Sequence, residues 1–292
     1  MSAQELVLSL GLSPCPNDTF IFHALLEGLV RVPAPAPWSG HIRFVPHFAD
    51  VEELNAMAVA GRLDVTKLSL GAVARIMEGY ALFSSGAALG WGCGPLVVAE
   101  RPLTPEQLAS ARVAVPGFMT TANLLLDLHG GFGGPRREIL FSDIMDAVAR
   151  GEDEAGVIIH EGRFTYAEHG LVKILDLGEW WEGAFHLPLP LGAIAGKRNL
   201  PLAVGLAVEA AIAESLRHAW AHPEVSRAFI RAHAQELDDA VTSAHIETFV
   251  TAYSEDLGPA GREAITTLVR RSAKLLGVPM PAAGLFWPEA AA

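Results

Sequence analysis

The fold is decided by the stretch Val157-Ile158-Ile159-His160-Glu161-Gly162-Arg163, in which an apolar run gives way to a polar loop. Its β-branched residues, preceded by Ala155 and Gly156, predict a buried strand, and His160 stands where that strand ends. Open α/β sheets bind ligands in the crevice outside the carboxyl ends of their strands. Imidazole exchanges a proton near neutral pH without special tuning. His160 is therefore a candidate catalytic base, and the alternative is a hydrogen-bonded spacer at a strand end.

Strand and helix patterns alternate outward from this stretch. Apolar runs predict strands over residues 6–12, 42–48, 63–66, 95–99, 113–115, 139–141 and 187–194, besides the strand at 157. Capping patterns predict helix starts at Asn17 or Asp18, at Asp50 with Glu53, at Lys67 to Ser69, at Thr104, at Thr121 and at Ser142. After Leu200 the pattern is helical to the end of the chain.

This order of elements predicts an α/β fold in which one α/β unit interrupts another. At 292 residues the chain exceeds the usual size of a single domain. The larger, discontinuous lobe is expected over residues 1–97 and 195–292, and the smaller inserted lobe over residues 98–194. A helical segment ends the chain. Two extended crossings join the lobes, and such a plan places the ligand in the cleft between them.

Composition excludes several classes of partner. The formal net charge of −12 and the isoelectric point near 5.3 argue against nucleic acid or an anionic membrane. Residues 1–5 contain no basic segment typical of secretion, and no uninterrupted apolar run reaches the roughly 18 residues of a membrane span. We therefore expect a cytoplasmic protein that acts on a small molecule.

The two cysteines, Cys15 and Cys93, lie in turns rich in proline and glycine. A disulfide between them is not expected in a reducing compartment. Neither has a cysteine or histidine within metal-ligand spacing, so no metal site is predicted. As nucleophiles, Ser13, Cys15 and Cys93 lack a histidine nearby in the sequence, although one distant in the sequence could still approach them in space.

Three expected helix starts follow strands and could face one cleft: the start after Ser13, the start at Ser69, and the start at Thr120 and Thr121. Each offers unpaired backbone N–H groups and the positive end of a helix dipole, which suit carboxylates and hydroxyls. Any one alone is more simply an ordinary cap. Three together, with Lys67 beside one, predict an anion-binding cleft. For Lys67 the alternative is a solvated surface charge.

Two further segments carry weaker signals. The glycine-rich residues 90–95 suit a hinge or a close approach of backbone to ligand. They lack the dinucleotide fingerprint and its acidic partner, so nucleotide binding is not predicted there. Trp180 and Trp181 could close over an aromatic ligand, but paired tryptophans are more typical of a core edge or an interface.

Six segments, taken in order, resemble the 1,4-dihydroxy-6-naphthoate synthase family of the futalosine route to menaquinone. They are Ser13-Pro14-Cys15-Pro16-Asn17-Asp18-Thr19-Phe20-Ile21-Phe22, Asp64-Val65-Thr66-Lys67-Leu68-Ser69, Gly92-Cys93-Gly94-Pro95-Leu96-Val97-Val98, Pro116-Gly117 with Thr120-Thr121-Ala122, Val157-Ile158-Ile159-His160-Glu161, and Asp176-Leu177-Gly178 with Trp180-Trp181-Glu182. The first and the fifth are the most specific. The helical C-terminal third carries little of the pattern.

The resemblance implies the fold of the type II periplasmic-binding proteins, with the ligand cleft between two lobes. It implies that cyclic dehypoxanthine futalosine, a carboxylated, ribose-derived spirocycle, is converted into 1,4-dihydroxy-6-naphthoate by base-initiated elimination, with no metal or redox cofactor. His160 matches the family's proposed proton acceptor. The family's ligand contacts match Lys67, Leu68, Ser69, Thr120 and Thr121.

Several questions stay open at this level. Ser13, Asn17 and Cys93 are further candidates for the cleft. The related chorismate dehydratase of the same pathway is an alternative, disfavoured because the first and fifth segments follow the synthase pattern. A non-catalytic cytosolic binding protein is another, and it would tolerate His160→Asn or His160→Gln. The C-terminal helices could build a homodimer interface, and the sequence leaves the oligomeric state open.

Overall fold

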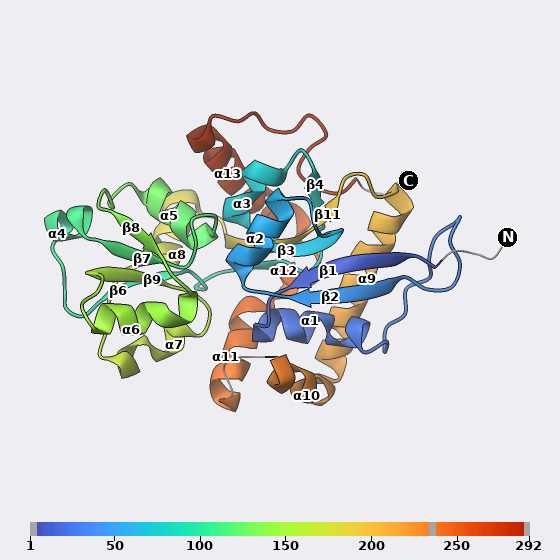
Figure 1. Cartoon of the computed structure of the whole chain (residues 1–292), viewed down its shortest axis with the longest axis horizontal. Coiled ribbons are helices and arrows are strands. Elements are labelled where there is room, and N and C mark those ends of the chain that lie inside the picture. Colours follow the sequence, from blue (N-terminus) through green and yellow to red (C-terminus); the bar gives the residue numbers. More distant parts are fainter. Residues whose placement is uncertain (1–4, 234–237, 289–292) are drawn as a thin grey trace.

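Two β-sheets frame the two lobes in the computed structural model, which describes residues 5–233 and 238–288 (Figure 1). The larger sheet has the order β2-β1-β3-β11-β4, with β5 paired to β11, and the smaller has the order β10-β6-β9-β7-β8. The strands of the larger sheet are β1 Val7–Leu12, β2 Arg43–Phe48, β3 Val65–Ser69, β4 Tyr80–Leu82, β5 Ala88–Gly90 and β11 Leu189–Lys197. Those of the smaller sheet are β6 Leu96–Ala99, β7 Val113–Val115, β8 Arg136–Glu138, β9 Ala155–Ile158 and β10 Val172–Asp176.

Helices cover both sheets. In the larger lobe they are α1 Pro16–Leu26, α2 Val51–Val59, α3 Leu70–Ile76, α9 Leu202–Ala221, α10 Pro223–His233, α11 Asp239–Phe249, α12 Ala252–Glu255 and α13 Gly258–Leu276. In the smaller lobe, drawn from teal through green to yellow in Figure 1, they are α4 Pro105–Ser110, α5 Thr121–His129, η1 Phe141–Asp143, α6 Ile144–Ala149, α7 Gly162–Thr165, η2 Tyr166–His169 and α8 Leu177–Phe185. Within residues 5–233 and 238–288, none of these helices is long and apolar enough to cross a bilayer.

Strand β11, which follows the smaller lobe in the chain and lies in the larger sheet, shows why that sheet is apolar on both faces. Its neighbours β3 and β4 both run antiparallel to it. Ile194 packs into a core cluster with residues of α1 and α9, whereas Ala193 and Ala195 pack into a second cluster with residues of α3 and α13. Successive side chains of a strand point to opposite faces, so helices on both sides bury the whole run.

The two-lobed α/β plan and the helical C-terminal segment are confirmed, and three local expectations are wrong. Lys67 and Leu68 lie in strand β3 rather than open a helix, because β11 pairs with residues 67–69, whereas Ser69 ends β3 and is the N-cap of α3 as expected. The strand expected over 139–141 lies earlier, at β8, where it pairs in parallel with β7. The N-cap of α1 is Cys15, followed by Pro16, so Asn17 and Asp18 lie inside the first turn.

The chain crosses between the lobes where consecutive strands belong to different sheets. The chain leaves the larger sheet after β5 and enters the smaller sheet at β6. It returns through α8 to β11. Strands β4, β5 and β10 and helix α8 had no predicted counterpart. The lobe boundaries at 97/98 and 194/195 stay a prediction.

Gly71, in the first turn of α3, lies against the start of α5. A Cβ built on Gly71 would stand 2.5 Å from the carbonyl oxygen of Thr120 and 2.6 Å from that of Met119. The Gly71 N–H donates to the hydroxyl of Thr121 at 3.2 Å. A larger residue cannot fit without moving backbone, so glycine at this position lets the two lobes meet.

We expect Gly71→Ala to lower the free energy of unfolding by about 1–3 kcal/mol, because the added methyl group must push the backbone carbonyls of Met119 and Thr120 away from α3. The matched control is Gly79→Ala, since Gly79 is exposed and its nearest atom would stand 3.7 Å from the new Cβ. That control should change stability by less than about 0.5 kcal/mol. Urea denaturation measures both, and equal values would contradict the packing argument.

Candidate active site

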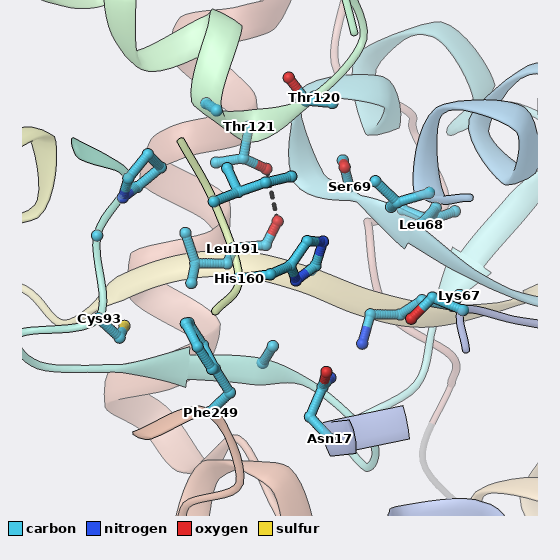
Figure 2. Close-up of a pocket in the computed structure, with 18 of the residues that line it drawn as sticks. Asn17, Lys67, Leu68, Ser69, Cys93, Thr120, Thr121, His160, Leu191 and Phe249 are labelled. Atoms are coloured by element: carbon cyan, nitrogen blue, oxygen red, sulfur yellow. Dashed lines mark hydrogen bonds between the residues drawn. The ribbon is translucent and has the colours of Figure 1, made fainter. Parts of the chain in front are cut away.

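A cavity of about 80 Å³ lies between the lobes (Figure 2). Its lining includes the nine residues expected to act as base, ligand contacts or further cleft candidates: Ser13, Asn17, Lys67, Leu68, Ser69, Cys93, Thr120, Thr121 and His160. Arg163, Leu191 and Phe249 are among the lining residues that the sequence did not single out. The volume is below the roughly 300 Å³ of common small-molecule sites. The space between the lobes in this structure is therefore smaller than a typical ligand site.

His160 stands near the centre of this cavity, just beyond the end of β9 (Figure 2). Its backbone is left-handed, with φ of 53°, a conformation that raises the energy of most residues by roughly 1–2 kcal/mol. Two rings hold it there. Phe141 meets the imidazole edge-on with ring centroids 5.0 Å apart, and His245 stacks on it with centroids 5.9 Å apart. A strained backbone fixed by packing is typical of functional positions.

Burial lowers the pKa of His160 from its ordinary value, and the carboxylate of Glu161 opposes part of that effect. The imidazole is therefore neutral at neutral pH. A neutral ring has a nitrogen lone pair free to accept a proton, which is the state that a general base requires.

The thiol of Cys15 is the neighbour of His160 that the sequence could not show. Its Sγ lies 3.9 Å from Nε2 of His160. Burial, followed by the charge of Glu161, raises the pKa of the Cys15 thiol, and burial raises that of Cys93 to about 12. Both therefore stay protonated, and Cys15 can donate its S–H to the imidazole. A reactive cysteine needs a lowered pKa, so neither thiol is a nucleophile at neutral pH.

The carboxylate of Asp18 is buried behind the cavity wall, where it contacts three residues that line the cavity. Lys67 Nζ lies 2.5 Å from Oδ1, where Asn17 Nδ2 also donates at 2.8 Å. The N–H and hydroxyl of Ser13 donate to Oδ2 at 3.1 and 2.7 Å. The side chains of Asp18 and Lys67 are 0% and 6% exposed, so the surface-charge alternative for Lys67 is wrong. Ser13 donates to a carboxylate rather than to a histidine, so it is not activated as a nucleophile.

The start of α5 joins the two lobes beside the cavity. Thr120 is its N-cap, and its hydroxyl accepts from the N–H of Asn123 at 3.2 Å. The hydroxyl of Thr121 donates to the carbonyl of Leu191 on β11 at 2.5 Å, the dashed line in Figure 2. The first-turn N–H groups of a helix have no partner within the helix, so this end of α5 suits an anion.

Arg163 brings a second cation to the cavity wall. Its guanidinium pairs with Asp176 at 3.2 Å and donates to the carbonyl of Gly94. Asp176 also caps α8 by accepting from the N–H groups of Gly178 and Glu179. The cap pattern at residues 176–178 could have predicted helix α8 from the sequence, with Asp176 as its N-cap.

The paired tryptophans lie on α8. Trp181 is fully buried, and its indole N–H donates to the carbonyl of Pro188 at 3.1 Å. The core-edge interpretation therefore holds for Trp181, whose ring packs inside the protein rather than over the cavity.

Known proteins similar to this chain in sequence agree in their family and in their name. The family model described as menaquinone biosynthesis matches residues 8–274. A 1,4-dihydroxy-6-naphthoate synthase from Thermus thermophilus is 48% identical over 275 residues, which are 94% of this chain and 97% of that protein. Another from Streptomyces coelicolor is 43% identical over 276 residues, which are 91% and 93% of the two chains.

Solved structures give the same fold. A protein from Archaeoglobus fulgidus is 32% identical, with a TM-score of 0.84 over 93% of this chain and 98% of that one. The periplasmic aliphatic sulphonate binding protein from Escherichia coli is 14% identical, with a TM-score of 0.64 over 98% of this chain and 94% of that one. The second likeness shows the two-lobed fold alone.

Removing the Asp18 carboxylate should leave the ammonium of Lys67 buried without a counter-ion. We expect Asp18→Ala to lower the free energy of unfolding by about 3–5 kcal/mol, the usual effect of breaking a buried ion pair. The control is Glu5→Ala, because the pair of Glu5 with Arg43 is exposed and such pairs contribute about 0–1 kcal/mol. Chemical denaturation that gave equal losses would show that Asp18 does not stabilise Lys67.

The raised thiol pKa values predict unreactive cysteines. In the folded protein at pH 7, iodoacetamide should leave Cys15 and Cys93 unmodified, whereas unfolding in urea should expose both to alkylation. Mass spectrometry of the two samples measures the difference. Rapid alkylation of native Cys15 would mean that His160 activates it as a thiolate.

Proposed function

Because the chain belongs to the menaquinone biosynthesis family, we propose that its interlobe cavity is the active site and that His160 is the base which starts the reaction. The activity is that of a 1,4-dihydroxy-6-naphthoate synthase, the name that both curated relatives carry. The proposed substrate is cyclic dehypoxanthine futalosine, and the proposed products are 1,4-dihydroxy-6-naphthoate and a ribose-derived fragment. The position of the His160 imidazole in the cavity is the observation that supports the assignment, and the pKa lowered by burial agrees with it.

His160 would take a proton from the sugar-derived carbon of the spirocycle. The electron pair left on that carbon starts the elimination, and formation of the aromatic naphthoate makes the overall reaction favourable. A positioned general base contributes a factor of about 10² to 10⁴ to the rate. Closure of the lobes would supply the rest through positioning and exclusion of water.

We propose that the substrate carboxylate is held by the start of α5, at Thr120 and Thr121, together with Lys67 and Ser69. These residues line the same cavity, and α5 presents the positive end of its dipole there. The ammonium of Lys67 has three donor positions, and its contact with Asp18 fixes it in place. Leu68 lies between Lys67 and Ser69 on β3 and completes this part of the wall.

Ser13, Asn17 and Cys93 would shape the cavity rather than react. Ser13 and Asn17 donate to the carboxylate of Asp18, and so hold the counter-ion of Lys67. The protonated thiol of Cys93 lines the cavity near the crossing between β5 and β6. Each acts through its neighbours in this proposal.

The remaining proposals concern the whole molecule. We propose that residues 98–194 move as the smaller lobe against residues 1–97 and 195–292. We further propose a cytoplasmic enzyme and a homodimer. Neither alternative function is favoured, because both curated relatives carry the synthase name rather than that of a chorismate dehydratase or a binding protein.

His160→Asn tests the proposed base. Asparagine tolerates a left-handed backbone, so the variant should fold with the wild-type melting temperature to within a few degrees. We expect its turnover of cyclic dehypoxanthine futalosine to fall by a factor of about 10² to 10⁴, because no group remains to accept the proton. Chromatography of 1,4-dihydroxy-6-naphthoate measures the rate.

The matched control is His41→Asn, since His41 lies on the surface before β2 and away from the cavity. Wild-type turnover in His160→Asn would remove His160 from the mechanism. Absence of product in the wild-type protein as well, with a ligand-induced shift of its melting temperature, would favour the binding-protein alternative.

A further inference from the structure

His245, on α11, lies against His160 from the opposite lobe. It is 1% exposed, and its ring is nearly parallel to that of His160, with an angle of 13° between the planes. Phe249, one turn further along α11, lines the cavity and also packs against His245, with ring centroids 4.6 Å apart. Sequence patterns could not reveal this contact, because His245 lies in the C-terminal helices, far from His160 along the chain.

The hydrogen bonds around His245 fix its tautomer. The carboxylate of Asp18 can only accept, so Asn17 turns its NH₂ group toward Asp18 and its Oδ1 toward His245. Nε2 of His245 lies 3.1 Å from that oxygen and must carry the hydrogen. Nδ1 then carries no hydrogen, and its lone pair is free to accept one. It is buried and has no hydrogen-bond partner within the described part of the chain, and Glu161 Oε2 lies 3.8 Å away.

A buried ring with a bare nitrogen resists a second proton. Burial, then His160 and then Lys67, lowers the pKa of His245 well below its ordinary value. His160 therefore has a neutral, flat neighbour rather than a competing cation. The ionisable groups that act on the His160 ring come from its own loop, from α1 and its N-cap, from the N-cap of α2 and from β3: Glu161, Asp18, Cys15, Asp50 and Lys67.

We propose that His245 is a positioning residue for His160: held by the amide of Asn17, its neutral ring covers one face of the imidazole, excludes water from it and fixes its orientation in the cavity. This inference rests on the proposed role of His160 as the base. It connects the ion pair of Lys67 and Asp18 to the base through Asn17 and His245. His245 does not line the cavity, so its action on the substrate is indirect.

Two variants separate the ring contact from the hydrogen bond. His245→Ala removes both and admits water beside His160, whereas His245→Phe keeps a flat ring of similar size and loses only the bond to Asn17. Two readouts are needed: the pKa of His160, from NMR titration of its ring protons in the free enzyme, and the acid limb of kcat/KM. In the wild type both should lie below 6.5, because burial lowers the pKa of His160, so activity is lost as the pH falls through that value.

We expect His245→Ala to move both values up toward 6.5, since less burial leaves the protonated ring better solvated. Its kcat should fall by about tenfold to a hundredfold with KM changed less than about threefold, the pattern of a base that is misplaced rather than a ligand contact that is lost. His245→Phe should keep both pKa values at the wild-type position and recover most of the turnover. The control His23→Ala removes another buried histidine, on α1, and should lower the melting temperature without moving either value.

Unmoved pKa values and kcat in His245→Ala, with only a lower melting temperature, would overturn the proposal, because a structural residue alone gives that result. Loss of activity in His245→Phe equal to that in His245→Ala would also overturn it, since the ring contact would then have no effect. If His245→Ala does not fold, His245→Gln replaces it, because glutamine keeps polar atoms near Asn17 but has no ring. An NMR pKa that moves while the kinetic limb does not would support the ring contact and refute His160 as the base.

Discussion

The buried carboxylate of Asp18 is the interaction on which the rest of the site depends. An isolated charge inside a protein is destabilising by several kcal/mol, so it persists only where donors surround it. Here the donors come from the turn after β1, from α1 and from the central strand β3. Satisfying one carboxylate thus fixes the ammonium of Lys67, the orientation of the Asn17 amide and, through that amide, the tautomer of His245.

The second constraint is the meeting of the lobes around the cavity. The Thr121 hydroxyl contacts Gly71 and Leu191, and the carboxylate of Glu52 accepts from the N–H of Met119 at 2.8 Å. These hydrogen bonds join α5 and the loop before it to the larger lobe. In the same structure His160, just beyond β9 of the smaller lobe, meets His245 of the larger lobe, with ring centroids 5.9 Å apart.

Local patterns predicted much of the fold. Apolar runs located β1, β2, β7 and β9, and the cap of α5 at Thr120 was evident because capping depends on neighbouring residues alone. The misplaced elements have non-local causes. Residues 67–69 stay in β3 because a strand more than a hundred positions away pairs with them. Strands β4 and β5 form by pairing with β11, which lies far along the chain.

The sequence by itself determined the two-lobed α/β class, the strand that leads to His160 and the residue types of the cavity wall, because these depend on periodicity, caps and a contiguous motif. Only the tertiary structure decided how deeply those residues are buried, what they contact and whether they carry a proton. It buried Lys67 against Asp18, placed a protonated Cys15 beside His160 and stacked His245 on the base. Burial and through-space charge set the protonation of a side chain, and neither can be read from positions that the chain brings together only on folding.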